Sequence, residues 1–231
     1  MKTLLLTLLA CLPLAAFASN TSKVNGSVRV EAGQTAGDVS TVNGSVTIEE
    51  GATAEDVDTV NGSVTIERNA TVRGAESVNG GISLGEDAKA TSMETVNGKL
   101  RLAERAQVSG DVSAVNGSAE LAKGVEVRGR LSNVNGKMTI EGAHVGGGLK
   151  TVNGDIDIGA DSRIEGGIVV EKPNQSWNIG KQHVPRIVIG PGAVVDGKLR
   201  FDHEVELLVS DRAKIGAVEG AKAVTFSGSK P

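Results

Sequence analysis

The tripeptide Val-Asn-Gly recurs eight times in this chain of 231 residues, and its spacing constrains the fold more than any other feature. Its asparagines are Asn25, Asn43, Asn61, Asn79, Asn97, Asn116, Asn135 and Asn153. Successive copies are 18 residues apart, except for two steps of 19 residues. A near-constant period of this length is typical of a solenoid, because each unit buries its apolar face only by stacking on its neighbours.

Within each unit, apolar residues recur in steps of about six. One run of such residues is Val42, Ile48, Ala54, Val60, Ile66 and Val72. Alternating segments such as Val46-Thr47-Ile48 are typical of strands, and three short strands joined at corners make a triangular coil. The sequence therefore predicts an all-β fold, a single-stranded parallel β-helix of roughly ten coils with about 18 residues each. The repeated valines are expected in its core.

The eight asparagines are interpreted as structural corner residues, because Asn and Gly both tolerate the positive φ angles of tight bends. Threonines at positions 41, 59, 95 and 151 precede the valine and would form a partial surface column beside the asparagines. A second interpretation of the same pattern is an antiparallel meander, since Asn-Gly between alternating residues is also a strong hairpin signal. The six-residue steps favour the β-helix.

The composition excludes several classes of protein. Aromatic residues make up 2% of the chain and tyrosine is absent, so a globular core built around large rings is excluded. The formal net charge of -4 and the scarcity of rings argue against a nucleic-acid partner, which needs basic surfaces and stacking platforms.

The first residues resemble a secretory signal peptide. Lys2 precedes an apolar run from Leu4 to Leu14, and Ala16-Phe17-Ala18 forms a small-x-small cleavage site. We therefore expect residues 1–18 to be removed, no transmembrane segment to remain, and the chain to be exported to the periplasm, the cell surface or the medium. The alternative is a lipoprotein acylated at Cys11.

Residues 19–231 are predicted to form one β-helix domain with an insertion at 171–185 and a C-terminal cap. The insertion holds the single tryptophan of the chain, and the candidate contacts for a ligand or partner are Trp177 and His183. Phe201 and Phe226 suit a cap over the last coil.

No catalytic, cofactor-binding or metal-binding residue is predicted. His144, His183 and His203 are interpreted as solvated corner residues. The sequence places no second histidine or ordered carboxylate at a spacing that would indicate a partner for a catalytic histidine. The acidic groups around Glu49 and Asp56 lack the Gly-Gly-x-Gly-x-Asp pattern of calcium-binding β-rolls, and solvated charge is the better interpretation.

The stepwise segment IGPGAVVDGKLRF at 189–201 resembles hexapeptide-repeat β-helices, and Gly37-Asp38-Val39 and Gly110-Asp111-Val112 resemble the bactofilin group. The resemblance covers roughly residues 24–226. It implies a polymer-forming triangular β-helix, although bactofilins are typically cytoplasmic or attached to the inner face of the membrane, unlike a chain with an export signal. The repeated segment VNGSVTIE also resembles the repeats of exported adhesin-type β-strand-repeat proteins.

Together these features predict a non-enzymatic, exported structural, scaffolding or adhesive β-solenoid of the cell envelope or surface. Self-association through the coil ends is expected, since exposed edge strands with unpaired backbone N–H and C=O groups can pair with another copy. Two alternatives stay open. One is a module that binds a ligand or glycan through the 171–185 insertion, and the other is a hexapeptide-repeat acyltransferase.

Overall fold

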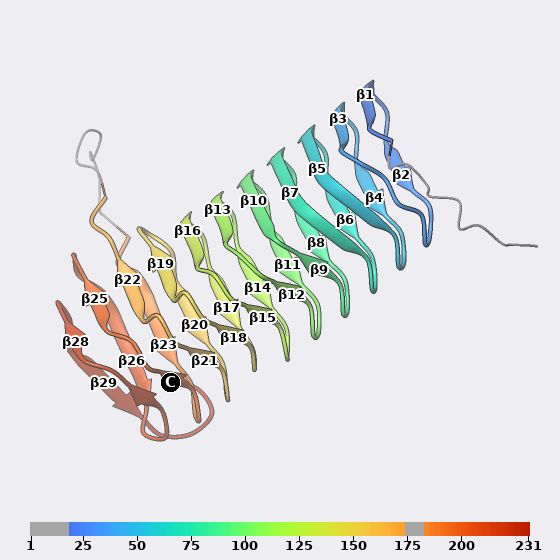
Figure 1. Cartoon of the computed structure of the whole chain (residues 1–231). Coiled ribbons are helices and arrows are strands. Elements are labelled where there is room, and N and C mark those ends of the chain that lie inside the picture. The colour runs from blue at the N-terminus through green and yellow to red at the C-terminus, as the bar shows by residue number, and fades with distance from the viewer. Residues whose placement is uncertain (1–18, 174–182) are drawn as a thin grey trace, which may run out of the picture.

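The chain forms a stack of parallel coils in a computed structural model that describes residues 19–173 and 183–231 (Figure 1). The stack runs from β1 (Thr21–Asn25) at the N-terminal end to β28 (Val218–Glu219) and β29 (Ala223–Phe226) at the C-terminal end. Every pairing between named strands is parallel, which excludes the antiparallel meander and confirms the β-helix. The predicted signal peptide, with Cys11, and the predicted contact residue Trp177 lie outside the described residues.

The strands divide into three faces, and the first face is an 11-stranded sheet with one strand from each coil. Its strands are β2 (Val28–Val30), β4 (Val46–Ile48), β6 (Val64–Ile66), β8 (Ile82–Leu84), β11 (Leu100–Leu102), β14 (Ala119–Leu121), β17 (Met138–Ile140), β20 (Ile156–Ile158), β23 (Arg186–Ile189), β26 (Glu206–Ser210) and β29 (Ala223–Phe226). The structure thus has eleven coils, one more than the sequence predicted.

The other two faces belong to an 18-stranded sheet that bends at a corner. Two of its strands, β5 (Thr53–Asn61) and β7 (Thr71–Asn79), span both faces. The second face also holds β9 (Lys89–Ala90), β12 (Gln107–Val108), β15 (Glu126–Val127), β18 (His144–Val145), β21 (Arg163–Ile164), β24 (Val194–Val195) and β27 (Lys214–Ile215). The third face holds β1 (Thr21–Asn25), β3 (Val39–Asn43), β10 (Ser92–Asn97), β13 (Val112–Asn116), β16 (Leu131–Asn135), β19 (Leu149–Thr151), β22 (Ile168–Val170), β25 (Leu199–Phe201) and β28 (Val218–Glu219).

Each face contributes two inward side chains per coil, separated by one outward residue. In the coil that begins with β4, the first face buries Val46 and Ile48, the second buries the alanines at 52 and 54, and the third buries Val57 and Thr59. The core is therefore a set of aliphatic ladders, in which each side chain packs on its equivalents one coil above and below. Because adjacent strands lie ~4.8 Å apart, equivalent side chains of neighbouring coils are in van der Waals contact.

The corners absorb changes in the length of the repeat. Two residues, Glu55 and Asp56, separate the inward positions Ala54 and Val57. In a 19-residue unit, three residues separate Val108 from Val112, yet both valines remain buried. Stacking of the faces thus fixes which positions point inward, and the extra residue is accommodated at the bend.

Candidate functional site

The third face and the corner that follows it carry the most regular surface of the molecule. At this corner the eight repeated asparagines stack, and from Asn43 onward each Nδ2 donates to the Oδ1 of the asparagine one coil nearer the N-terminus. The seven N···O distances lie between 2.9 and 3.1 Å. This asparagine ladder runs unbroken from Asn25 to Asn153 and has no equivalent at the other two corners among the described residues.

The glycine that follows each asparagine is needed for close approach more than for an unusual φ. A Cβ atom on Gly62 or Gly80 would fall far inside van der Waals contact with the carbonyl oxygen of the stacked glycine one coil before. None of the ladder asparagines has a positive φ, and of the glycines after them only Gly26 and Gly136 do. Tolerance of positive φ therefore does not explain the asparagines at this corner.

The hydroxyl residues two positions before the asparagines are buried, so the expected surface column of threonines is also wrong. Thr41, Thr59, Ser77 and Thr95 are each at most 4% exposed. Their hydroxyl groups donate to glycine carbonyl oxygens of the preceding coil's Asn-Gly corner over 2.8–3.0 Å. The glycine carbonyl thus gives each buried hydroxyl group a hydrogen-bond partner.

The repeated valines point outward, which corrects the prediction that they lie in the core. We call them the valine column: Val24, Val42, Val60, Val78, Val96, Val115, Val134 and Val152. Val42, Val60 and Val78 are 41–42% exposed, whereas Val57 on the same face is fully buried. Side chains alternate along a strand, so with Thr59 inward its neighbour Val60 must face solvent.

Beside the valine column, on the same outward surface, runs a carboxylate column formed by Asp58, Glu76 and Glu94. Asp58 is in register with Glu76 across β5 and β7, and Glu76 with Glu94 across β7 and β10. No ion pair within the described parts of the chain includes any of the three. Burial, together with the charges of Glu76, Asp56 and Asp38, raises the pKa of Asp58 above its usual value.

These two columns line a shallow groove that we call the third-face groove. It extends from Ser22 and Lys23 on β1 to Glu94 and Val96 on β10. One side is apolar and the other is acidic. Like charges on adjacent strands repel each other, so this arrangement costs the isolated chain stability.

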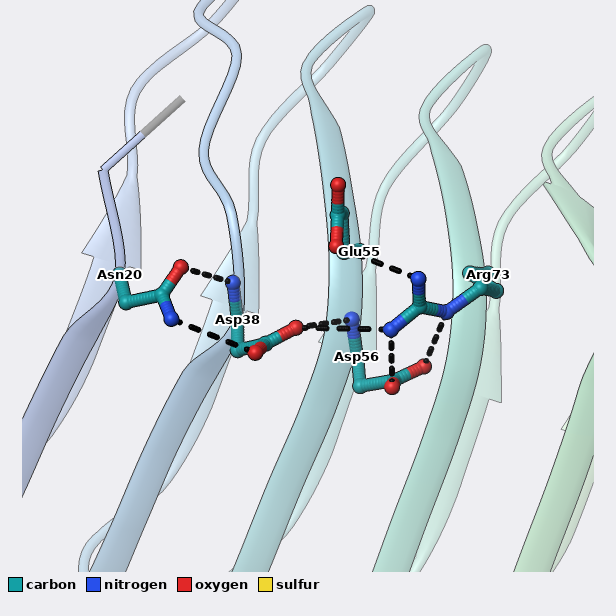
Figure 2. A network of polar contacts seen from close by, with 5 residues as sticks. All are labelled: Asn20, Asp38, Glu55, Asp56 and Arg73. Atoms are coloured by element: carbon teal, nitrogen blue, oxygen red, sulfur yellow. Dashed lines mark hydrogen bonds and ion pairs between the residues drawn. The ribbon is translucent and has the colours of Figure 1, made fainter. Parts of the chain in front are cut away.

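A cation does lie on the neighbouring corner, where Arg73 contacts three carboxylates (Figure 2). Its guanidinium group hydrogen-bonds both oxygens of Asp56, one of them over 2.9 Å, and lies 3.2 Å from Glu55 and 3.6 Å from Asp38. The Arg73 hydrogen bond lowers the pKa of Asp56. Asp38 in turn accepts from the backbone N–H of Asp56 over 3.4 Å. Each carboxylate of this cluster therefore has a cationic partner, unlike those of the carboxylate column, although one arginine balances only one of the three charges.

The three histidines lie apart from one another, and two of them have a carboxylate partner that the sequence did not reveal. His183 Nε2 lies 2.9 Å from Asp155 Oδ1, which also accepts the backbone N–H of Arg186 over 2.9 Å. His144 lies on β18, not at a corner, with Nε2 3.3 Å from Glu165. His203 Nε2 lies 2.9 Å from the carbonyl oxygen of Val152, beside the point where the insertion leaves the coil.

The acidic residues considered for calcium are instead paired or dispersed. Glu49 forms an ion pair with Arg29 at 2.7 Å. Within residues 19–173 and 183–231, no three His, Cys, Asp or Glu side chains gather so that they could hold a metal ion. In the same residues, no helix is long and apolar enough to cross a membrane.

The fold defines the chain as a parallel β-solenoid repeat protein with eleven coils. Its sequence matches no protein-family model and no curated protein. No solved structure matches it either.

Proposed function

We propose that the chain is an exported, non-enzymatic β-solenoid that serves as a structural or adhesive element and assembles end to end. The architecture supports this role, because stacked coils with a continuous aliphatic core make a stiff rod with a repeated surface. The resemblance to polymer-forming β-helices favours the same role.

The observation that carries the proposal is the pair of open edges at the ends of the first face. Among the described strands, β2 pairs only with β4, and β29 pairs only with β26. Val28 donates its N–H to Ser45 in the next coil, and Val30 accepts from Glu49 there. Since alternate residues of a parallel strand point their backbone groups to opposite sides, the N–H and C=O of Arg29 point away from β4. They form a template for a strand of another copy.

The third face is less suited to such pairing at its N-terminal edge. Lys23 lies one coil before Thr41 in the same column, is exposed, and donates its Nζ to the carbonyl oxygen of Ser27 over 3.0 Å. A lysine on an edge strand disfavours docking of a second sheet. End-to-end contact is therefore assigned to the first face, with β29 of one copy beside β2 of the next.

Light scattering and electron microscopy of residues 19–231 test this assembly. We expect concentration-dependent filaments or rods longer than one chain. Arg29→Pro removes the outward N–H and should shorten them, whereas Arg29→Ala loses the Glu49 ion pair but keeps the N–H and should assemble normally. A strictly monomeric rod at high concentration would refute the proposal.

Export is tested separately, on the full chain. N-terminal sequencing of the protein recovered from the envelope or the medium should begin at Ser19, after loss of residues 1–18. A product that retains Met1, or one that begins at an acylated Cys11, would contradict this part of the proposal.

A further inference from the structure

The third-face groove combines two features that the fold itself does not explain. The valine column leaves apolar side chains in solvent along β3, β5, β7 and β10, although the outward positions of a solvated face are ordinarily polar. The carboxylate column stacks three like charges in register, and none of them forms an ion pair within the described residues. Both features are unfavourable for the isolated chain, and both lie on one side of the molecule.

From this geometry we propose that the third-face groove docks a basic amphipathic helix of a partner protein, with its apolar side on the valine column and its lysines or arginines on the carboxylate column. The proposal rests on the structural role given above, and it states which kind of partner the scaffold binds. Charge complementarity selects a cationic occupant, because three carboxylates, Asp58, Glu76 and Glu94, line the groove. The one cation in its lining, Lys23, lies at the N-terminal end.

The spacing selects a helix over an extended strand. Successive members of either column are one coil, ~4.8 Å, apart along the solenoid axis. A helix along that axis repeats its faces every ~5.4 Å, so the two steps from Asp58 to Glu94 accumulate a mismatch of only ~1.2 Å. An extended strand repeats its faces every ~6.7 Å and would be displaced by almost 4 Å over the same two steps.

The width of the groove also suits a helix. Asp58 and Val60 are outward residues of the same strand, β5, with one inward residue between them. Such side chains are ~6.7 Å apart, which lies within the ~10 Å diameter of a helix with its side chains. One helix can therefore cover both columns at once.

The proposal is tested with a synthetic helical peptide of leucine and lysine as the probe. Binding to residues 19–231 is measured by titration calorimetry, against a scrambled peptide of the same composition. We expect the helical peptide to bind better than the scrambled one. Glu76→Gln and Val78→Ser should each weaken its binding at least about fivefold, because each removes one wall of the groove at its centre.

The matched control is Glu31→Gln, which makes the same charge change at an exposed residue outside the groove. It should leave affinity within about twofold, as expected of a charge remote from the contact. A second readout needs no partner: Glu76→Gln should raise the Tm of the free chain by about 1–3 °C, because it relieves repulsion from Asp58 and Glu94.

Equal binding of the scrambled peptide, or an equal loss with Glu31→Gln, would overturn the proposal in favour of unspecific charge attraction. A lower Tm for Glu76→Gln would also overturn it, since the carboxylate would then be structural. So would dimerisation of the chain through this groove, because the occupant would be a second copy. Failure here leaves the scaffold role standing, since that role is judged by filament length in Arg29→Pro.

Discussion

The inward or outward direction of the third-face valines can be tested with one charge placed at two positions of β5. Val57 is fully buried, while Val60, three residues later, is 41% exposed. We compare Val57→Asp with Val60→Asp, because the sequence pattern alone assigns both valines to the core.

Val57→Asp should remove most of the stability of the coil stack. Loss of the buried valine costs about 2 kcal/mol. The buried carboxyl group would have a strongly raised pKa, so keeping it neutral from its unfolded pKa of ~3.9 to pH 7 costs about 4 kcal/mol more. The sum of about 6 kcal/mol is comparable to the whole stability of many domains, about 5–15 kcal/mol. Val60→Asp should cost about 1 kcal/mol, because its carboxylate remains hydrated.

Urea denaturation followed by far-UV circular dichroism measures both variants, in about 0.5 M NaCl to screen repulsion between the new carboxylate and Asp58. Since the folded state of Val57→Asp holds its proton more tightly than the unfolded state, its deficit should shrink as the pH falls from 7 toward 4. The deficit of Val60→Asp should change little with pH. Similar losses for the two variants, or a larger loss for Val60→Asp, would refute the assigned strand register.

Three further predictions concern the corners. Gly80→Ala should cost about 3 kcal/mol or more, because its Cβ meets the backbone of Gly62; Gly51→Ala, with φ of 68° but open space, should cost only about 1–2 kcal/mol in thermal denaturation. Asn97→Ala breaks two ladder hydrogen bonds and Asn25→Ala breaks one, so urea denaturation should show a loss of about 1–2 kcal/mol for the first and about half for the second. Arg73→Met should lower the Tm at pH 7, and the gap should close as the pH falls below the pKa of Asp56, because that carboxylate favours folding only when ionised; an unchanged gap at pH 2 would contradict this linkage.

The sequence predicts the architecture because stacking repeats the same requirement in every coil. Apolar residues occupy the positions equivalent to Val46 and Ile48 in every repeat. Stacked parallel coils bury all of these residues in one continuous core. The 18-residue period and the three strands per coil follow from the same columns.

The same reasoning misplaced the valine column because hydrophobicity was taken as the sign of an inward residue. Each face in fact buries two residues separated by one, as at 46 and 48, 52 and 54, and 57 and 59. Side chains alternate along a strand, so an inward Val57 predicts an inward Thr59 and an outward Val60. This alternation could have been applied to the sequence alone. The hydroxyl of Thr59 is buried only because a glycine carbonyl lies within 2.8 Å, and that contact joins different coils.

The groove and the histidine contacts could not be predicted from spacing alone. The alignment of Asp58, Glu76 and Glu94 follows from the period once the outward positions are known. By contrast, the contact between His183 and Asp155 spans 28 residues across an insertion, and no repeat links the two.

The asparagine ladder gives the rod a direction. Backbone hydrogen bonds between coils run both ways, as when Gly26 donates forward to Asn43 and Glu49 donates backward to Val30. The side-chain amides all donate toward the N-terminus, so their dipoles add instead of cancelling. The amides along this corner therefore form a row with one polarity. Within the part of the chain that the structure describes, the Nδ2 of Asn25 and the Oδ1 of Asn153 form no hydrogen bond in the ladder.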